Sequence, residues 1–415
     1  MDNEQWREFM DAAIGVPPGQ VTVAAVRRRV VRRRVARAAE VTGVVVVVLA
    51  VLGATAAVRV FGTPSGPAAG RPAVPATVYV AFNPPHGKLS IFTIVPINPV
   101  TKKAGKPIHI RCSCDVAASP DGKTLYVAAD NSIIPISTAT NEPGRPIHIG
   151  NDRAGRIQID PDGKTAYVTS LLTNGVTPIN LTTRKPGQTI QVRSTGEIGF
   201  TPDGKTAYVL GFTEHSAIVT PINTVTNKPG KPVHVAAGDN EIAITPNGKT
   251  AYVAGGDVVT PINTATNTAG KPIQVPVRGA NDMAITPNGK TLYIAISARP
   301  KGGVVIPIST ATNTAGQPIN VLSAEEIAIT PDGKTAYVSS SEGPNHALTP
   351  ISTATNTAGK PITSVGYPWI AITPDGKTLY AASGDKVTPV NTTTNKPGKP
   401  ITTHYGTTWG LVITP

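Results

Sequence analysis

Cysteine is nearly absent from this sequence. The 415 residues include only Cys112 and Cys114, so disulfide bonds do not hold the fold together. Two cysteines are too few to bind zinc unaided, and they could form a strained local disulfide or remain free thiols. Familiar catalytic signatures are missing as well: the sequence has no His-Glu-x-x-His, no Gly-rich phosphate loop and no Ser-His-Asp set. The sequence therefore gives no direct sign of an enzyme.

Long uncharged apolar runs are also scarce, and the main one lies between Val41 and Val58. As a helix its 18 residues would span roughly 27 Å, close to the hydrocarbon core of a bilayer. Seven arginines precede it, which places that side of a membrane helix in the cytoplasm: Arg27, Arg28, Arg29, Arg32, Arg33, Arg34 and Arg37. We predict a basic cytoplasmic segment over residues 1–40, a transmembrane helix over 41–60 and a Pro/Gly/Ala linker over 61–76.

A cleaved signal peptide is the alternative to this anchor, because Ala54-Thr55-Ala56 has the small-x-small pattern of a cleavage site. The 40 residues before the apolar run are long for a secretory signal, which favours an uncleaved anchor. Both interpretations place the rest of the chain outside the cytoplasm. We expect it on the cell membrane, or secreted if the segment is cleaved.

Turn residues are abundant, with 40 Gly and 40 Pro, and they recur at a fixed period. The stretch 242–252, Ile-Ala-Ile-Thr-Pro-Asn-Gly-Lys-Thr-Ala-Tyr, has the pattern of a strand, a tight turn and a second strand. The proline that opens this turn recurs in steps of 41 to 44 residues, at Pro120, Pro161, Pro202, Pro246, Pro287, Pro331, Pro374 and Pro415. A period of this length, built from strands and turns, is typical of a β-propeller.

Each repeat contains four strand patterns, which we call A (Ile-Ala-Ile-Thr), B (Ala-Tyr-Val), C (Val-Thr-Pro-Ile) and D (Lys-Pro-Ile-x-Val). Each pattern occurs eight times over residues 77–415, with repeats starting near 116, 157, 198, 242, 283, 327 and 370. This region begins with a strand B and ends with a strand A. We therefore predict an all-β, eight-bladed β-propeller of four-stranded blades, closed by pairing the C-terminal strand A with the N-terminal strands B to D.

Proline inside strand C is awkward, because proline cannot donate a hydrogen bond to the ladder. We expect a bulge there, or a ladder that starts only after the proline. Proline in strand D fits the outer edge of a blade, where no inward donor is needed.

The tandem pattern Ile-Thr-Pro-Asp-Gly-Lys-Thr-Ala-Tyr-Val … Val-Thr-Pro-Ile-Asn-Thr-Ala-Thr-Asn … Gly-Lys-Pro-Ile resembles the YVTN-type β-propeller repeat family of surface-layer and exported proteins. The resemblance covers residues 77–415 and implies the fold. It does not imply one function, because related propellers include lactonases, enzyme subunits, DNA-binding proteins and adhesion modules. The family commonly has seven blades, so a count of eight departs from its pattern.

The chain has a net charge of +13, and many of its basic residues fall on one face of the predicted propeller. The A–B and C–D turns share this face, which we call the turn face. Its A–B turns carry a repeated lysine, at Lys123, Lys164, Lys205, Lys249, Lys290, Lys334 and Lys377. The lysines could simply keep the turns solvated, or they could bind a polyanion such as nucleic acid, a teichoic-type polymer or phospholipid headgroups. The sequence lacks interleaved exposed aromatics there, which disfavours nucleic acid.

The opposite face, which we call the loop face, holds the B–C and D–A loops that vary between copies, and such loops commonly bind ligands. The residue that enters each strand A should ring the central channel there: Asp115, Arg156, Glu197, Glu241, Asp282, Glu326, Trp369 and Gly410. The five carboxylates could hold a cation such as Ca²⁺ or a polyhydroxy ligand, with Trp369 and Trp409 stacking on a sugar. Alternatively they are ordinary polar loop ends that need no cofactor.

These observations favour a membrane-anchored, extracytoplasmic propeller that binds a protein, glycan or cell-wall partner and performs no chemistry. One alternative is a lactonase-like or metal-assisted hydrolase that uses the acidic residues at the channel mouth. A second is DNA or polyanion binding through the turn face. The geometry of the five carboxylates separates these hypotheses, because carboxylates directed away from the axis would weaken the cation site and the hydrolase together.

Overall fold

The computed structural model describes residues 76–82, 91–111, 115–150, 152–170, 172–192, 196–212, 217–236, 241–275, 279–297, 302–340, 346–363, 365 and 369–414. Within these ranges no helix is long and apolar enough to cross a membrane. The predicted cytoplasmic segment, transmembrane helix and linker as far as residue 75 lie outside them, as do Cys112 and Cys114.

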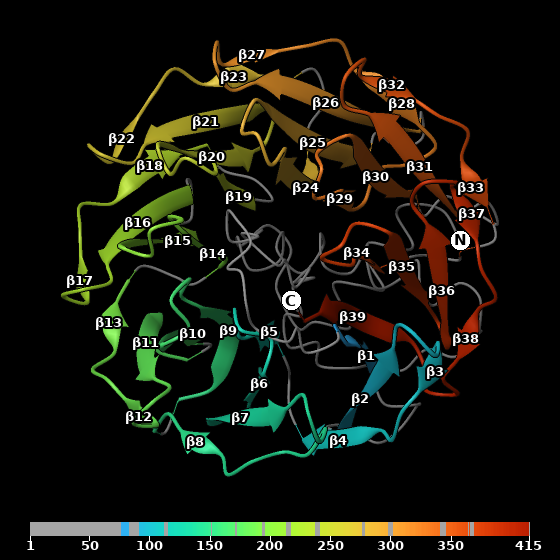
Figure 1. Ribbon diagram of the computed structural model, residues 1–415. Coiled ribbons are helices and arrows are strands. Elements are labelled where there is room, and N and C mark those ends of the chain that lie inside the picture. Colours follow the sequence, from blue (N-terminus) through green and yellow to red (C-terminus); the bar gives the residue numbers. More distant parts are fainter. Residues whose placement is uncertain are drawn as a thin grey trace, which may run out of the picture. The chain divides into compact units, whose positions relative to one another are not determined.

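The strands form eight antiparallel sheets that follow one another as blades around a central axis (Figure 1). Blade 1 combines β39 with β1–β4. The remaining blades follow in chain order: β5–β8, β9–β13, β14–β18, β19–β23, β24–β28, β29–β33 and β34–β38. This arrangement confirms the predicted all-β, eight-bladed propeller.

Each blade has four strand layers. The innermost layer, strand A, contains β5 (Val116–Ala118), β9 (Ala154–Ile159), β14 (Ile198–Phe200), β19 (Glu241–Ile244), β24 (Ala280–Ile285), β29 (Ile327–Ile329), β34 (Trp369–Ile372) and β39 (Thr408–Ile413). The second layer, strand B, contains β1 (Val78–Phe82), β6 (Thr124–Ala129), β10 (Thr165–Ser170), β15 (Thr206–Phe212), β20 (Thr250–Gly255), β25 (Thr291–Ser297), β30 (Thr335–Ser340) and β35 (Thr378–Ser383).

The third layer, strand C, contains β2 (Ile91–Asn98), β7 (Ser132–Ser137), β11 (Gly175–Asn180), β16 (Ala217–Asn223), β21 (Val258–Asn263), β26 (Gly303–Ser309), β31 (Ala347–Ser352) and β36 (Lys386–Asn391). The outer layer is a single strand, β8 (Ile147–His148), in blade 2. In the other blades it is split into two short strands: β3 (Lys103–Ala104) and β4 (Ile108–Arg111), β12 (Lys185–Pro186) and β13 (Ile190–Gln191), β17 (Lys228–Pro229) and β18 (Val233–Val235), β22 (Thr268–Ala269) and β23 (Ile273–Gln274), β27 (Thr314–Ala315) and β28 (Ile319–Val321), β32 (Thr357–Ala358) and β33 (Ile362–Thr363), and β37 (Lys396–Pro397) and β38 (Ile401–Thr402).

The ring closes as the repeat order predicts. Strand β39, from the end of the chain, pairs antiparallel with β1, from its beginning, and Val80 lies opposite Leu411. Just beyond the strands, the Thr77 N–H donates to Thr414 Oγ1 at 2.8 Å, and the Thr414 N–H donates to the Thr77 carbonyl at 3.0 Å. Because β1 is covered on both sides, neither end of the repeat leaves an exposed inner edge.

Proline in strand C does not cause the bulge that the sequence led us to expect. Strands β20 and β21 pair continuously, with Pro261 opposite Tyr252 and no shift of register. The Pro261 carbonyl accepts from Gly270 N–H at 2.7 Å, so this residue directs its backbone polar groups toward the outer layer. Strand B therefore loses no donor, and the outer layer divides instead into β22 and β23. The same bond, also 2.7 Å long, recurs in all eight blades.

The hydrophobic core is divided among the interfaces between blades. Eight clusters of buried residues each join two neighbouring blades, and the one between blades 5 and 6 brings Tyr252 and Val259 against Met283 and Ile294. The cluster that joins blade 8 to blade 1 has the same form, with Tyr380 and Val387 against Val80 and Leu411. A blade therefore buries its apolar faces only by packing against both neighbours.

A polar contact between the repeated tyrosine of one blade and an asparagine of the next accompanies this packing. Tyr208 O–H donates to Asn267 Oδ1 at 2.6 Å, and equivalent bonds join Tyr79 to Asn141, Tyr167 to Asn227, Tyr252 to Asn313, Tyr293 to Asn356 and Tyr337 to Asn395. Asn267 has φ of 54°, in the left-handed region that asparagine tolerates better than most residues. At the other two interfaces Arg184 and Lys102 occupy the asparagine position.

We predict that this tyrosine–asparagine contact contributes measurably to stability. Asn267→Ala removes the acceptor of the Tyr208 hydroxyl and places alanine at a positive φ, so it should destabilise the protein by about 1–3 kcal/mol. Arg184→Asn supplies the missing amide opposite Tyr126 and should raise the melting temperature. Thermal denaturation of both variants tests the idea, and it fails if they shift the melting temperature in the same direction.

Candidate functional site

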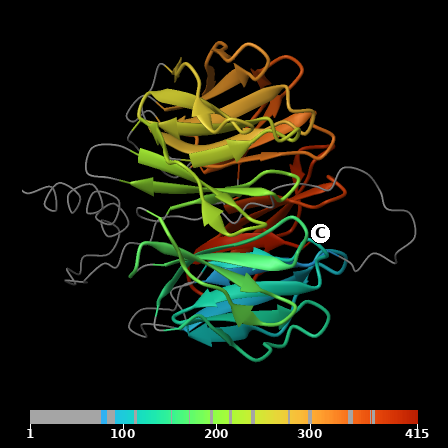
Figure 2. The same cartoon turned by 90° about the vertical axis from the view of Figure 1, so that its left-hand side faces the viewer.

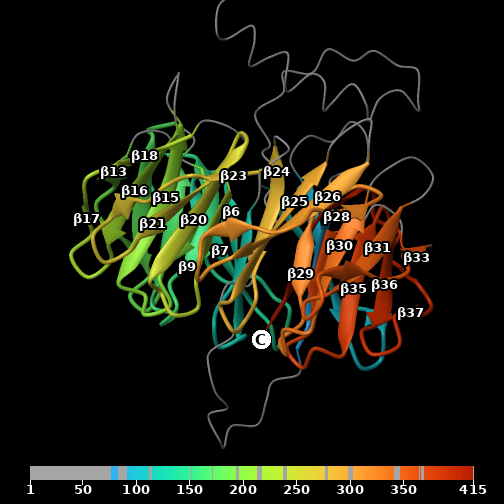
Figure 3. The same ribbon diagram turned by 90° about the horizontal axis from the view of Figure 1, so that it is seen from above.

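The propeller has two faces, one formed by turns and the other by loops. Figure 3 shows the blades edge-on, so that the two faces lie at opposite rims. The end of the chain, to which β39 leads, is marked C at the lower rim in that view and on the right-hand side of the blades in Figure 2. Since strand A leads into the A–B turn, this rim is the turn face. The loop face is the opposite rim, where strand A begins.

Most of the predicted ring of carboxylates on the loop face contacts the backbone of the neighbouring blade. Asp282 Oδ2 accepts from Ile327 N–H at 2.8 Å, and its Oδ1 accepts from Met283 N–H at 2.6 Å. Three other residues of the ring repeat this contact with the next innermost strand: Asp115 with Ile157 at 2.9 Å, Glu197 with Ile242 at 3.1 Å and Glu326 with Ile370 at 3.0 Å. Four of the five carboxylates thus link one strand A to the next.

Burial and charge act in opposite directions on Asp115. Its side chain is buried, which raises the pKa of the carboxyl above its ordinary value, and the nearby Arg156 charge opposes that rise. The backbone N–H of Arg156 itself donates to Thr169 Oγ1 at 2.7 Å. The charge of Arg156 therefore stabilises a carboxylate that is already engaged with the backbone of blade 3.

The remaining ring positions vary in role. Glu241 begins β19 and lies opposite Ala254 of β20. Trp369 begins β34 and packs, half-buried, against the core cluster between blades 8 and 1. Trp409 and Gly410 lie in β39. Within the described ranges, no group of three or more His, Cys, Asp or Glu residues could hold a metal ion.

We predict that Asp282 is a structural residue. Asp282→Ala leaves two buried N–H groups without their acceptor and should lower the free energy of unfolding by about 2 kcal/mol, whereas Asp282→Asn keeps an acceptor oxygen and should cost less. Denaturant unfolding with and without millimolar Ca²⁺ provides the measurement. If Ca²⁺ stabilises the native protein and Asp282→Ala abolishes that effect, the residue is a cation ligand instead.

The turn face is rigid and basic. In blade 5 the Thr264 hydroxyl donates to the Gly248 carbonyl at 2.5 Å, and the Thr264 N–H donates to the Lys249 carbonyl at 3.1 Å, which joins the C–D turn to the A–B turn. All seven predicted lysines of the A–B turns are exposed. Over its A–B and C–D turns the face carries 19 Lys and Arg against seven Asp and Glu, a net charge of +12.

The acidic residues in the A–B turns of this face accept hydrogen bonds from their own turns. Thr201 O–H donates to Asp203 Oδ1 at 2.7 Å, which lowers the pKa of that carboxyl, and the lysine at 205 lies 3.8 Å from its other oxygen. Asn247 makes the same turn bonds in blade 5, accepting from Thr245 O–H at 2.8 Å and Lys249 N–H at 3.0 Å. Asparagine therefore preserves the turn while leaving its lysine without a neighbouring carboxylate.

Blade 3 departs from this pattern because Asp160 replaces the threonine of the turn. Its Oδ1 accepts from Lys164 N–H at 3.0 Å and from Thr165 N–H at 3.1 Å. Burial and the neighbouring Asp162 raise the pKa of Asp160 to about 6. Two carboxyl groups thus occupy a turn that in blades 2, 4, 7 and 8 pairs one carboxyl with a hydroxyl.

We predict that this pair makes stability depend on pH. The folded protein keeps a proton on Asp160 up to about pH 6, whereas the unfolded chain loses it near the ordinary pKa of 3.8. The folded state thus binds more protons between these values, and stability falls as the pH rises through this window. Asp160→Thr should stabilise the protein by about 1 kcal/mol at pH 7 and by much less at pH 4. Melting curves at both pH values check this, and an equal gain at both would contradict it.

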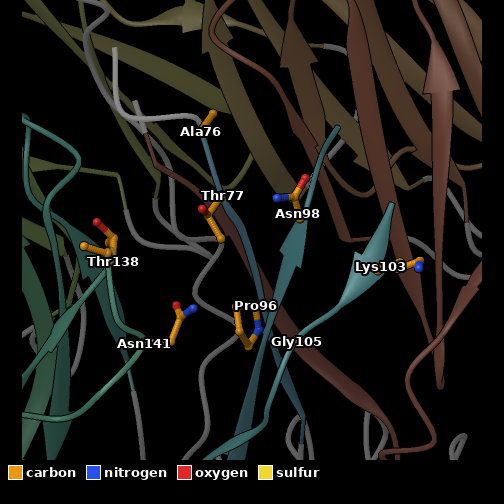
Figure 4. Close-up of a pocket in the computed structure, with 9 residues that line it drawn as sticks. Ala76, Thr77, Pro96, Asn98, Lys103, Gly105, Thr138 and Asn141 are labelled. Atoms are coloured by element: carbon orange, nitrogen blue, oxygen red, sulfur yellow. The ribbon is translucent and has the colours of Figure 1, made fainter. Parts of the chain in front are cut away.

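A pocket of about 420 Å³ opens on the turn face between blades 1 and 2. Figure 4 places Thr77 between Asn98 of blade 1 and Thr138 of blade 2, and Lys103 and Asn141 also line the space. Asn141 is the acceptor for Tyr79, so one wall of the pocket belongs to the contact between the two blades. The pocket therefore lies where the described chain begins.

Comparisons with known proteins support the fold. Neither a protein-family model nor a curated sequence matches the chain. Among solved structures, dihydro-heme d1 dehydrogenase NirN in complex with DHE has a TM-score of 0.64 at 14% identity, covering 84% of this chain and 77% of that one. A functionally unknown protein from Desulfotomaculum acetoxidans DSM 771 has a TM-score of 0.53 at 16% identity, covering 68% and 96%. Kuenenia stuttgartiensis hydrazine synthase has a TM-score of 0.50 at 21% identity, covering 60% and 86%.

Identities this low show only a shared fold. The chain is a β-propeller, an architecture that serves widely as a scaffold or binding module. Membership of the YVTN-type family stays a prediction. The tyrosine–asparagine contacts were not predicted from the sequence, although both residues recur at fixed places in most repeats and that recurrence was the available signal.

Proposed function

We propose that this protein is a membrane-anchored, extracytoplasmic β-propeller of the YVTN type whose loop face binds a protein, glycan or cell-wall partner without catalysis. The observation that carries the proposal is the use of the ring carboxylates. Asp115, Glu197, Asp282 and Glu326 each hold the backbone of the next blade. A catalytic acid or base must be free to approach a substrate proton, and these groups stabilise the ring instead.

The loop face also has the character of a binding surface. Its described residues include four Lys and Arg against ten Asp and Glu, a net charge of −6. Three further acidic residues of this face lie in the short connections between strands B and C and do not belong to the set of residues that enter strand A: Asp130, Asp257 and Asp385. An acidic face on a rigid ring suits a partner that presents basic or hydroxyl groups.

The anchor is tested with the full chain carrying an N-terminal and a C-terminal epitope tag in bacterial cells. We expect the protein to stay in membranes at pH 11, and external protease to remove only the C-terminal tag from intact spheroplasts. Val48→Arg, in the middle of the apolar run, should reduce insertion because a central arginine costs about 2.5–3.5 kcal/mol. Recovery of the native chain in the pH 11 supernatant would contradict an anchor, and loss of the N-terminal tag from an exported, soluble product would indicate cleavage.

The absence of catalysis is tested with a panel of lactones and esters. We expect turnover no higher than that of heat-denatured protein, and no change with Glu241→Gln, which alters the ring carboxylate at the start of β19. Hydrolysis that falls more than a hundredfold in this variant would establish a hydrolase and overturn the proposal.

A further inference from the structure

We propose that the turn face lies against an anionic lipid bilayer and that the loop face is directed away from it. This inference rests on the proposed membrane anchor and adds an orientation and a ligand class to it. Three features of the described residues support it: the separation of charge between the faces, the place where the chain enters the ring and the chemistry of the exposed turns.

Charge separates the two faces. The turn face carries a net charge of +12, and the described residues of the loop face carry −6. All 19 basic residues of the turn face are exposed. The nearby carboxylates, such as Asp162 at 3.2 Å from Lys164 Nζ, lie in solvent, where ion pairs are weak. A broad positive surface of this kind is attracted to the phosphates of anionic headgroups.

The chain enters the propeller on the same face. Thr77 is hydrogen-bonded to Thr414 at the end of β39, which leads to the turn face. Only 16 residues, 61–76, separate the predicted transmembrane helix from this point. A flexible linker of that length has an r.m.s. span of about 20–25 Å, and strand B carries the loop face roughly 20 Å farther from the linker. The tether therefore holds the turn face, rather than the loop face, near the bilayer.

The exposed apolar side chains favour a lipid surface over a nucleic acid. Val100 and Val225 lie in the C–D turns of blades 1 and 4, with 79% and 78% of their surface exposed. Valine gains free energy when it enters the interface between headgroups and acyl chains, whereas a phosphate polymer offers it little. The basic side chains and these two valines belong to turns that hydrogen bonds fix in place, so the face docks as one unit.

Blades 5 and 6 carry the least neutralised lysines of the A–B turns. Asn247 and Asn288 stand where other blades have aspartate, so Lys249 and Lys290 have no carboxylate two residues earlier. These lysines are the best places to weaken docking while leaving the fold intact, because their side chains are exposed and their turns are held by backbone bonds.

The test measures energy transfer from a fluorophore on the propeller to acceptors on lipid headgroups. The full chain, carrying Cys112→Ser and Cys114→Ser, is reconstituted into nanodiscs of phosphatidylglycerol and phosphatidylcholine. One cysteine for labelling is introduced by Val225→Cys on the turn face or by Leu172→Cys on the loop face, both highly exposed positions. We expect strong transfer from position 225 and weak transfer from position 172. Transfer from position 225 should fall in pure phosphatidylcholine or at 0.5 M salt.

Matched charge variants complete the experiment. Lys249→Gln with Lys290→Gln should lower the ratio of docked to undocked propeller by about 25-fold, or about fivefold per lysine. Arg111→Gln with Lys386→Gln removes the same charge from exposed loop-face residues and should leave the ratio unchanged. Equal transfer from positions 225 and 172, or transfer from position 225 that ignores salt and lipid charge, would overturn the proposal.

Two further outcomes keep the hypotheses apart. If the chain is extracted from membranes at pH 11, the membrane-anchor hypothesis is contradicted. The proposed function is then contradicted as well, whatever the turn face binds. A chain that remains in the membrane but shows no dependence on lipid charge would refute only the orientation. Tighter binding to duplex DNA than to anionic vesicles, at equal phosphate and salt, would assign the face to nucleic acid.

Discussion

The hydrogen bond between a tyrosine of one blade and an asparagine of the next is the contact on which the ring most visibly depends. A single blade cannot bury its apolar faces, so stability comes from the interfaces. At six of the eight interfaces the tyrosine packs its ring between the blades and satisfies its hydroxyl by donating to the asparagine in the neighbouring turn. Because the asparagine needs a left-handed backbone to present its oxygen, turn geometry and interface packing are one constraint.

A second set of contacts joins the blades at the opposite end of the strands. Carboxylates such as Asp282 and Glu326 accept backbone N–H groups from the next innermost strand. The tyrosine contacts lie toward the turn face and these carboxylates begin strand A at the loop face, so neighbouring blades are linked at both ends. Charge at the channel mouth is thus explained by assembly of the ring, and the search for a ligand moves outward to the loops.

The sequence predicted the architecture well because architecture depends on the repeat. The period set the number of blades, and the order of the first and last strands set the closure through β39 and β1. The bulge expected at Pro261 was wrong because successive residues of a strand direct their hydrogen-bonding groups to opposite sides. That alternation depends on register, which composition does not reveal. The contacts from Tyr208 and Asp282 were missed for a related reason, since each joins residues more than 40 positions apart.

Repetition also explains how the two faces of a propeller come to differ in charge. A turn that is copied around a ring repeats its charge on one face, and the turn lysine occurs seven times, five times in Pro-Asp-Gly-Lys and twice in Pro-Asn-Gly-Lys. Asparagine can replace aspartate without disturbing the turn, as Asn247 shows, so the positive charge of this face can rise without a structural cost. The loop face has no repeated charged turn, and its charges depend on the sequences of the individual loops. One face is therefore suited to a uniform, extended partner, and the other to a partner recognised residue by residue.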